Sequence, residues 1–336
     1  RHGTATLMFE LGVDELTAQR ILGHSRIEIT REIYTELRTA QNKKSVDMVL
    51  VFNGIPVFAL ELKNQYTAQN VDNAKTQWMY DRDPRELCFQ FNKRILAYFC
   101  VDHTDVFMTT KLAKGDTYFL PFNQGSNGAG NDGGKGNPVN PNGYPTAYLW
   151  EKVLQKDSAL DIVQKFIHRA NAKTLIFPRF HQLDVVRKLI ADVRANGTGK
   201  NYLIQHSAGS GKSNSIAWTA YRLASLHDEM NKPVFSSVII VTDRTVLDRQ
   251  LQDTISSFDH TLGTVETIGE GKSSKDLRDA INGGSRIIVT TLQKFPVIYS
   301  EVENTAGKGF AVIVDEAHSS QTGSSAIKLK TALADT

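Results

Sequence analysis

The chain has 336 residues, enough for two or three domains that each bury a core of their own. Lysine and arginine together number 39, and aspartate and glutamate 36, so net charge neither favours nor excludes a polyanionic partner. The two cysteines, Cys88 and Cys100, lie among apolar residues, which favours reduced core thiols in a cytosolic protein over a disulfide or a metal site. No apolar run approaches the roughly 20 residues that span a bilayer, so no membrane partner is expected.

The first clear structural signal along the chain is a β-hairpin. Strand-like runs at residues 46–52 and 55–63 flank Asn53-Gly54, a dipeptide typical of two-residue hairpin turns. In the second run, Glu61 and Lys63 interrupt an otherwise apolar strand, and both face the same side of it because they are two residues apart. A polar pair on one face of a buried strand is a candidate site.

Asp47 joins this pair in only one kind of hairpin register. A strict two-residue turn pairs Asp47 with Leu60 and sends its carboxylate to the opposite face. A three-residue loop formed by residues 52–54 pairs Asp47 with Ala59 instead, and Glu61 then becomes its diagonal neighbour. We expect that loop or an equivalent bulge.

Two carboxylates beside a lysine suit metal-assisted hydrolysis of a phosphodiester. A divalent ion held by Asp47 and Glu61 would neutralise the scissile phosphate and lower the pKa of the attacking water, while Lys63 positions that water or stabilises developing charge. The bare pattern, an Asp separated by thirteen residues from Glu-x-Lys, is weak, and a purely structural hairpin is the alternative. The strand context favours the catalytic interpretation.

The middle of the chain contains a composition shift. Residues 95–101 indicate the next core strand, whereas residues 124–145 are rich in glycine, asparagine and proline and predict a mobile loop or spacer, because they offer little apolar surface. Helical periodicity follows at residues 148–170, and a further amphipathic helix is expected at residues 183–190.

The last third alternates between strands and helices. Strand-like runs at residues 202–205, 237–242, 287–290 and 310–314 have helical stretches between most of them. This alternation predicts a parallel α/β sheet with ligands at the C-terminal ends of its strands.

Residues 207–213 predict a phosphate-binding loop between the first of these strands and a helix. Backbone N–H groups of a glycine-rich loop converge on phosphate oxygens at a helix N-terminus, where the dipole favours negative charge. Lys212 would reach the β- and γ-phosphates, and the Ser213 hydroxyl would ligate Mg²⁺. His206 stands where the common pattern has its first glycine. The expected nucleotide-binding residues of the loop are Gly209, Ser210, Gly211, Lys212 and Ser213.

The sequence Asp-Glu-Ala-His at residues 315–318 supports a nucleotide site, because it directly follows the apolar run 310–314. An aspartate at the end of a strand, here Asp315, can hold Mg²⁺ through water, and the adjacent Glu316 can polarise the attacking water. Either motif alone could be an ordinary turn. Both together, each after an expected strand, predict an ATP site.

From about residue 42 to its end, the chain resembles the R subunit of type I restriction enzymes (HsdR). The matching stretches are Val46–Asn64, Met108–Lys111, Tyr118–Asn123, Phe177–Gln182, Leu203–Ser213, Val241–Arg244, Thr291–Phe295 and Asp315–Gln321. The resemblance implies a PD-(D/E)xK nuclease domain fused to a RecA-like ATPase domain of helicase superfamily 2, which translocates double-stranded DNA. It also implies a methyltransferase (M) and a specificity (S) subunit as partners.

The resemblance assigns roles to single residues. Gln182 matches a residue that contacts adenine. The nuclease triad is matched by Asp47, Glu61 and Lys63, and the two ATPase motifs by Lys212, Ser213, Asp315 and Glu316. Thus the resemblance and the residue chemistry point to the same ATP and Mg²⁺ sites.

Two further assignments come from the resemblance alone. The family has a Gln-x-x-x-Tyr helix after the triad; here Gln77 and Tyr80 are three residues apart, so helix-surface packing is the alternative. The pair Thr290 and Thr291 resembles a motif that touches the DNA backbone, and its alternative is an ordinary strand end.

Residues 1–38 resemble instead the C-terminal end of tyrosine recombinases (phage integrases). By that match Arg1 and His24 would bind phosphate and Tyr34 would be the nucleophile. A helical cap that packs with the same residues is the alternative, and recombinase activity is not expected because the rest of the catalytic set would lie upstream. At the other end, the chain stops at Thr336, so we expect a missing second RecA-like domain and nucleotide binding without movement on DNA.

These observations predict an α/β chain with a short helical segment (1–38), a nuclease-like domain (39–156, including a flexible loop at 124–145) and a RecA-like ATP-binding domain (157–336). The expected function is that of the restriction subunit of a type I system, an ATP- and Mg²⁺-dependent endonuclease in the cytoplasm. Two alternatives remain: a helicase-like repair ATPase with a purely structural hairpin, and a non-catalytic, nucleotide-binding remnant of a truncated or fused gene.

Overall fold

The computed structural model describes residues 45–207, 209–242, 245–258, 265–268, 272–291 and 309–315. The chain forms two compact units, Arg1–His181 and Gln182–Thr336. Their division falls later in the chain than the boundary expected after residue 156. The recombinase-like segment with Tyr34 lies outside the described residues, and so does Glu316.

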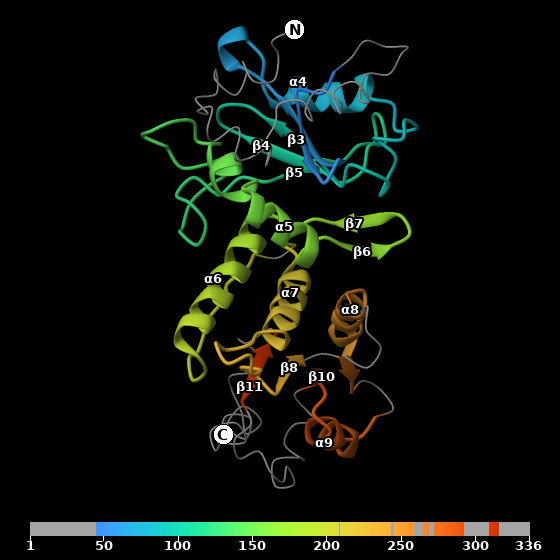
Figure 1. The fold of residues 1–336 in the computed structure, drawn as a ribbon, viewed down its shortest axis with the longest axis vertical. Coiled ribbons are helices and arrows are strands. Elements are labelled where there is room, and N and C mark those ends of the chain that lie inside the picture. The colour runs from blue at the N-terminus through green and yellow to red at the C-terminus, as the bar shows by residue number, and fades with distance from the viewer. Residues whose placement is uncertain are drawn as a thin grey trace. The chain divides into compact units, whose positions relative to one another are not determined.

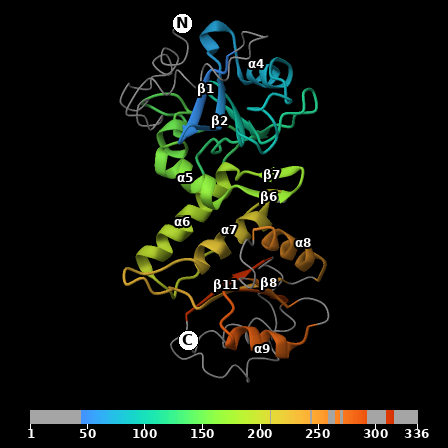
Figure 2. The same ribbon diagram turned by 45° about the vertical axis from the view of Figure 1, so that its right-hand side comes forward.

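The first unit contains a five-stranded mixed sheet in the order β1-β2-β3-β4-β5 (Figures 1 and 2). Its strands are β1 (Met48–Phe52), β2 (Ile55–Leu62), β3 (Ala97–Val101), β4 (Val106–Thr109) and β5 (Leu120–Pro121). Strands β1 and β2 form the expected hairpin, β2 and β3 run parallel, and the other neighbours are antiparallel. The parallel pair therefore brings the C-terminal ends of β2 and β3 to the same edge of the sheet.

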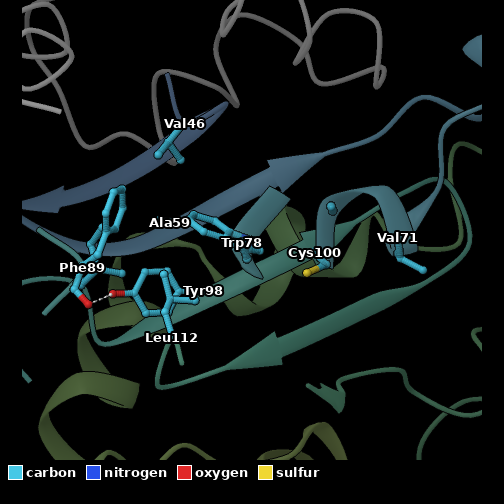
Figure 3. Close-up of a cluster of buried hydrophobic side chains, with 10 residues drawn as sticks. Val46, Ala59, Val71, Trp78, Phe89, Tyr98, Cys100 and Leu112 are labelled. Atoms are coloured by element: carbon cyan, nitrogen blue, oxygen red, sulfur yellow. Dashed lines mark hydrogen bonds between the residues drawn. The ribbon is translucent and has the colours of Figure 1, made fainter. Parts of the chain in front are cut away.

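One face of this sheet is covered by helix α4 (Val71–Thr76), which continues into one π-helical turn, η2 (Gln77–Asp81). Asn70 caps the start of α4 with its side chain. Trp78 in the π-helical turn is fully buried, and its indole N–H donates to the carbonyl of Phe99 at 3.0 Å, which fixes the helical segment to β3. The buried side chains beneath the helix are Val46, Ala59, Val71, Ala74, Trp78, Phe89, Ile95, Tyr98, Cys100 and Leu112 (Figure 3).

The opposite face of the sheet packs into a cluster of phenylalanine rings. Side chains alternate along a strand, so Phe58 and Phe99 point away from the face that α4 covers. Neighbouring rings meet edge to face with centroids 5.7–6.2 Å apart. The members of the cluster are Phe58, Phe99, Phe122, Phe177 and Phe180. Because the last two belong to it, the stretch around residue 178 is part of the first unit.

The first unit is completed by η1 (Gln65–Thr67), between β2 and α4, and by elements that follow the sheet. These are η3 (Leu149–Val153), α5 (Lys156–Lys165), β6 (His168–Asn171) and β7 (Thr174–Ile176). The helical periodicity expected over residues 148–170 is confirmed up to Lys165. Beyond that point the expectation is wrong, because β6 and β7 form an antiparallel two-stranded sheet.

Residues 124–145 are irregular but fixed by hydrogen bonds, and they lie within the first unit. The amide of Gly125 donates to the carbonyl of Gly136 at 2.8 Å, and the amide of Gln124 donates to Oδ1 of Asn137 at 2.8 Å. The Asn137 side chain in turn donates to the carbonyl of Thr104 at 2.8 Å. Of the two expectations, a mobile loop or a spacer, the segment is thus a loop within the first unit, and its mobility stays a prediction. Asparagine side chains and glycine backbones supply the contacts that apolar residues cannot supply here.

The second unit contains a four-stranded parallel sheet in the order β11-β8-β10-β9, as the alternating pattern predicts (Figure 1). Its strands are β8 (Ser237–Thr242), β9 (Val265–Thr267), β10 (Ile287–Thr291) and β11 (Phe310–Val314). The helices are α6 (Phe180–Asn196), which begins in the first unit, α7 (Lys212–Ala224), α8 (Thr245–Ser256) and α9 (Ser274–Asn282). Helix α9 packs with one face of the sheet, and α7 contacts β8, β10 and β11.

The strand expected at residues 202–205 is absent from the structure. The segment is irregular, and Leu203 is 84% exposed. Its start is held by helix α6, because the hydroxyl of Tyr202 donates to Asp192 at 2.6 Å and Lys200 lies 3.1 Å from the same carboxylate. Among the described residues, β11 therefore pairs only with β8.

The described helices include none that is long and apolar enough to cross a membrane. Both cysteines are free thiols, with Cys100 buried against the sheet and Cys88 half-buried.

Candidate functional site

The β1–β2 hairpin combines a tight turn with a bulge. Asn53 and Gly54 have φ angles of 49° and 82°, the left-handed pair that a two-residue hairpin turn requires. The register then shifts between Leu50 and Val51, which leaves Val57 as an extra residue in β2. The predicted three-residue loop is therefore wrong, and the alternative, an equivalent bulge, is confirmed.

The bulge brings the two candidate carboxylates to one face. Beyond it Met48 pairs with Leu60, and continuing this register sets Asp47 across from Glu61. Glu61 also pairs with Cys100 of the parallel strand β3, on the side of the sheet that α4 covers. The carboxylates thus meet at the C-terminal edge of β2.

Hydrogen bonds and ion pairs join the predicted triad. Oδ2 of Asp47 accepts a hydrogen bond from the amide of Leu62 at 2.8 Å. The ammonium nitrogen of Lys63 lies 3.5 Å from that same oxygen and 3.8 Å from Oε2 of Glu61. The structure therefore brings Asp47, Glu61 and Lys63 together, and all three stand in or beside β2.

Arg82 is a member of this site that the sequence pattern did not reveal. Its Nε donates to Oε1 of Glu61 at 3.2 Å, and Nη2 contacts the same oxygen. Nη2 also donates to the carbonyl of Ser45 at 2.7 Å. Arg82 follows the π-helical turn directly, 21 residues after Glu61 in the sequence. No spacing rule links two such positions, so only the packing of the helical segment on the sheet could reveal the pair.

The charges of the site are strongly coupled because Glu61 is fully buried, at 0% exposure. The pKa of Glu61 is raised to about 8. Burial is the main cause and the negative charge of Asp47 adds to it, whereas the Arg82 guanidinium lowers the pKa in part. Oε2 of Glu61 is buried and has no hydrogen-bond partner among the described residues. The two carboxylates are thus matched in number by the Lys63 and Arg82 cations, but one buried carboxylate oxygen has no hydrogen bond among the described residues.

These features fit a divalent metal ion. A hard ion such as Mg²⁺ binds oxygen ligands, and proteins commonly hold it with one or two carboxylates while water and phosphate complete its shell. Asp47 and Glu61 provide two such carboxylates, and Oε2 of Glu61 lies 3.8 Å from the Lys63 ammonium with no hydrogen-bond partner among the described residues. The described residues contain no group of three or more His, Cys, Asp or Glu side chains that could hold a metal by itself. Most of the ion's shell would therefore have to come from water and substrate.

Gln77 and Tyr80 both lie on the π-helical turn. Oε1 of Gln77 is buried with no hydrogen-bond partner among the described residues, whereas Tyr80 is exposed, with its hydroxyl beside Gly115. No described hydrogen bond or ion pair links either residue to the triad. Their catalytic role stays a prediction.

The glycine-rich loop has the conformation that a phosphate site needs. Gly209 and Gly211 have φ angles of 72° and 84°, where a side chain is strained, and the amide of Ser210 closes a turn onto the carbonyl of Ser207 at 3.2 Å. Helix α7 begins immediately afterwards at Lys212. The first-turn N–H groups of a helix lack intrahelical partners. The predicted order of loop and helix is thus confirmed, although the preceding segment is not a strand.

Gln182 contacts this loop directly. Its side-chain amide donates to the carbonyls of Gly211 at 2.9 Å and Ser210 at 3.2 Å, and the residue is buried. A Cβ atom placed on Gly211 would come within 2.5 Å of that amide nitrogen. Gln182 therefore braces the loop backbone, and the adenine contact expected for it stays a prediction.

Other predicted residues lie at the ends of the parallel strands. Asp315 follows β11, and its amide donates to the carbonyl of Val241 at 3.0 Å. Helix α7, which starts with Lys212, packs against this sheet. Thr290 and Thr291 end β10 with buried side chains, and their predicted contact with a DNA backbone stays a prediction.

Family models match the two halves of the chain separately. Residues 14–117 match the type I restriction enzyme R protein N terminus, and residues 181–336 match the SWI2/SNF2 ATPase. The first match contains the carboxylate site and begins within the recombinase-like segment. The second contains the glycine-rich loop and Asp315. The chain is similar to both families.

Individual proteins match parts of the chain as well. The type I restriction enzyme HindI endonuclease subunit of Haemophilus influenzae is 28% identical over 186 residues, which make up 52% of this chain and 17% of that subunit. The chain thus spans a small part of the length of this relative. The UvsW helicase from bacteriophage T4 is 20% identical, and the match covers 53% of this chain and 55% of that structure with a TM-score of 0.37. The chain is similar to a restriction-enzyme subunit over part of its length and to SWI2/SNF2 ATPases over residues 181–336.

Proposed function

We propose that this chain belongs to the restriction subunit of a type I restriction-modification system, which cleaves double-stranded DNA and uses ATP to translocate it. The convergence of Asp47, Glu61 and Lys63 on one face of the hairpin carries this proposal. The family match to the R protein N terminus over the same residues supports it.

Each residue of the carboxylate site has a distinct task in this proposal. Asp47 and Oε2 of Glu61 would hold Mg²⁺, which when bound neutralises the scissile phosphate and acidifies a water molecule. The Lys63 ammonium lies within 4 Å of both carboxylates, so it is placed to orient the attacking water or to stabilise charge on the phosphate. The burial of Glu61 and Lys63 excludes bulk water and strengthens these interactions.

The second unit would supply the energy. The loop of residues 209–211 would bind the nucleotide phosphates through its N–H groups, with Lys212 beside the β- and γ-phosphates. Ser213 and Asp315 would hold the nucleotide's Mg²⁺, and Glu316 would polarise the attacking water. The SWI2/SNF2 match over this unit supports ATP use. Methyltransferase and specificity subunits, and a cytoplasmic location, complete the proposal.

A nicking assay tests the proposed function. The full chain is incubated with supercoiled plasmid and Mg²⁺, with and without ATP, as wild type and as Glu61→Ala. We expect relaxation of the plasmid by the wild type and none by the variant. Nicking that persists unchanged in Glu61→Ala would assign cleavage to another site or to a contaminant. DNA-stimulated ATP hydrolysis without nicking would support a helicase-like ATPase with a structural hairpin, and nucleotide binding without either activity would support a non-catalytic remnant.

A further inference from the structure

Arg82 occupies an unusual place in the first unit. Its side chain is only 3% exposed, and its guanidinium carbon lies 5.9 Å from the centroid of the Trp78 ring. A buried guanidinium is costly unless its donors are satisfied, so its partners indicate what the residue is held there to do. Those partners belong to the two segments that carry the candidate metal-binding carboxylates.

The first partner is Glu61, and the contact is one-sided. Both Nε and Nη2 of Arg82 approach Oε1, and no hydrogen bond from Arg82 reaches Oε2. A forked guanidinium usually binds a carboxylate through both oxygens. Here it fixes the rotation of the carboxylate through one oxygen, and the other oxygen faces Lys63 at 3.8 Å. Oε2 is also the atom left without a hydrogen-bond partner in the described structure.

The second partner is the backbone that leads to Asp47. Nη2 of Arg82 donates to the carbonyl of Ser45 at 2.7 Å, two residues before Asp47. One side chain therefore ties the end of β2 to the start of the segment that carries the other carboxylate. The remaining contact of Arg82 is from Nη1, at 3.5 Å, to the carbonyl of Asp81, the last residue of the π-helical turn.

We propose that Arg82 is a positioning residue for the metal site, which sets the orientation of Glu61 and its separation from Asp47 so that the two carboxylates share one divalent cation. The proposal rests on the function proposed above. Arg82 itself does not touch the metal, because it occupies the far oxygen of Glu61. Residues that orient metal ligands typically alter metal affinity about 10–100-fold when they are replaced.

Lysine cannot reproduce this role. It keeps the positive charge beside Glu61, but its single ammonium group cannot contact Oε1 through two nitrogens and reach the Ser45 carbonyl in the same fixed plane. Arg82→Lys therefore separates geometry from charge. Arg85→Ala is the matched control, because Arg85 lies three residues away and pairs only with the nearby Asp83, at 2.6 Å, in an exposed ion pair.

Metal affinity tests the proposal directly. Mn²⁺ is titrated into the nucleotide-free full chain and followed by electron paramagnetic resonance, with Glu61→Gln marking the signal that belongs to this site. We expect the dissociation constant to rise about tenfold in Arg82→Lys and up to about a hundredfold in Arg82→Ala, and to be unchanged in Arg85→Ala. Plasmid nicking by Arg82→Lys should recover when the metal concentration is raised, whereas nicking by Glu61→Gln should not.

The outcomes separate this inference from the function it rests on. If the wild type binds Mn²⁺ at this site and Arg82→Lys binds it equally well, the positioning role is refuted and the nuclease proposal stands. If the Mn²⁺ binding of the wild type is the same as that of Glu61→Gln, the positioning role and the nuclease proposal are both refuted. A purely structural role for Arg82 predicts a lower melting temperature with an unchanged Mn²⁺ dissociation constant in the folded fraction. Circular dichroism measured on the same samples distinguishes that case, and Arg82→Lys serves if Arg82→Ala does not fold.

Discussion

The two candidate sites of this molecule are built in opposite ways. The carboxylate site joins side chains from separate segments, Asp47, Glu61 and Arg82, through the register of a hairpin and the packing of a helical turn. The nucleotide loop is a continuous stretch, residues 207–213, shaped mainly by its own glycines. A site made of neighbours in the sequence is visible as a motif. A site made across a sheet is not, because a register shift of one residue moves a side chain to the other face.

The two sites also differ in how their polar groups are satisfied. In the first unit, two carboxylates lie beside two cationic side chains, and one oxygen of Glu61 has no hydrogen-bond partner in the described structure. In the second, the neutral amide of Gln182 supports two backbone carbonyls of the loop. Substitutions should therefore affect the first site through charge and the second through loop shape. Four experiments test this difference.

Glu61→Gln is expected to give the largest difference between its effects on the two sites. The change removes the carboxylate that would bind the metal but keeps the shape, so Mn²⁺ binding at the hairpin and plasmid nicking should both fall to background. ATP affinity should stay at the wild-type value, because the substitution leaves the loop untouched. Calorimetric titration with each ligand measures the two affinities. Glu86→Gln, at a half-buried glutamate, is the control, and a parallel loss of ATP binding would contradict independent sites.

Lys212→Ala should have the reverse effect. Loss of a charged hydrogen bond to phosphate costs about 1.5–3 kcal/mol, so ATP affinity should fall about ten- to a hundredfold. The Mn²⁺ affinity of the hairpin site should not change. Equilibrium binding of a fluorescent ATP analogue gives the constant, with the exposed Lys232→Ala as control. Unchanged ATP affinity in Lys212→Ala would remove the loop from the nucleotide site.

Gln182→Ala should have a smaller effect that distinguishes a brace from a base contact. Each hydrogen bond contributes about 0.5–1.5 kcal/mol, so loss of the brace should weaken ATP and GTP binding alike, by about two- to tenfold. A direct adenine contact predicts a loss for ATP and little change for GTP. Competition binding with both nucleotides decides between these outcomes.

The last prediction concerns stability rather than ligand affinity, as a pH dependence of the melting temperature in metal-free protein. The pKa of Glu61 is raised to about 8 from an ordinary value of 4.5, so the folded state holds a proton that the unfolded state releases. This contribution is complete below pH 4.5 and is lost as the pH rises through about 8, so the melting temperature in EDTA should fall across that window. Each kcal/mol corresponds to about 2–4 °C in chains of 150–250 residues. Glu61→Gln should flatten the profile, and an equally steep profile in that variant would assign the proton elsewhere.

The sequence predicts the contiguous features well. The strands at residues 237–242 and 310–314, the helix after Lys212 and the hairpin turn at Asn53-Gly54 all form where their patterns indicate. Each depends on interactions within a few residues. The expected bulge also forms, and it places Asp47 and Glu61 on the same face of the hairpin.

The features that the sequence did not predict depend on distant partners. Arg82 has no local signal, since its role exists only where the π-helical turn meets β2. The apolar residues around Leu203 predict a strand, yet a strand also needs a neighbour, and here Asp192 of α6 holds the start of the segment. Residues 124–145 have the composition of a disordered segment because they contain few apolar residues. The side-chain hydrogen bonds that hold them, such as those of Asn137, produce no periodic pattern in the sequence.

The odd spacing between the two carboxylates explains the hairpin's irregularity. Thirteen residues separate Asp47 from Glu61, whereas directly opposed positions around a regular two-residue turn always enclose an even number. Val57 is the surplus residue, so a chain without it would form an unbroken ladder with the same acids opposed. Related chains with an even count would need no such distortion. When this segment is compared among related chains, the informative property is therefore whether the number of residues between the two acids is odd or even, and not how large that number is.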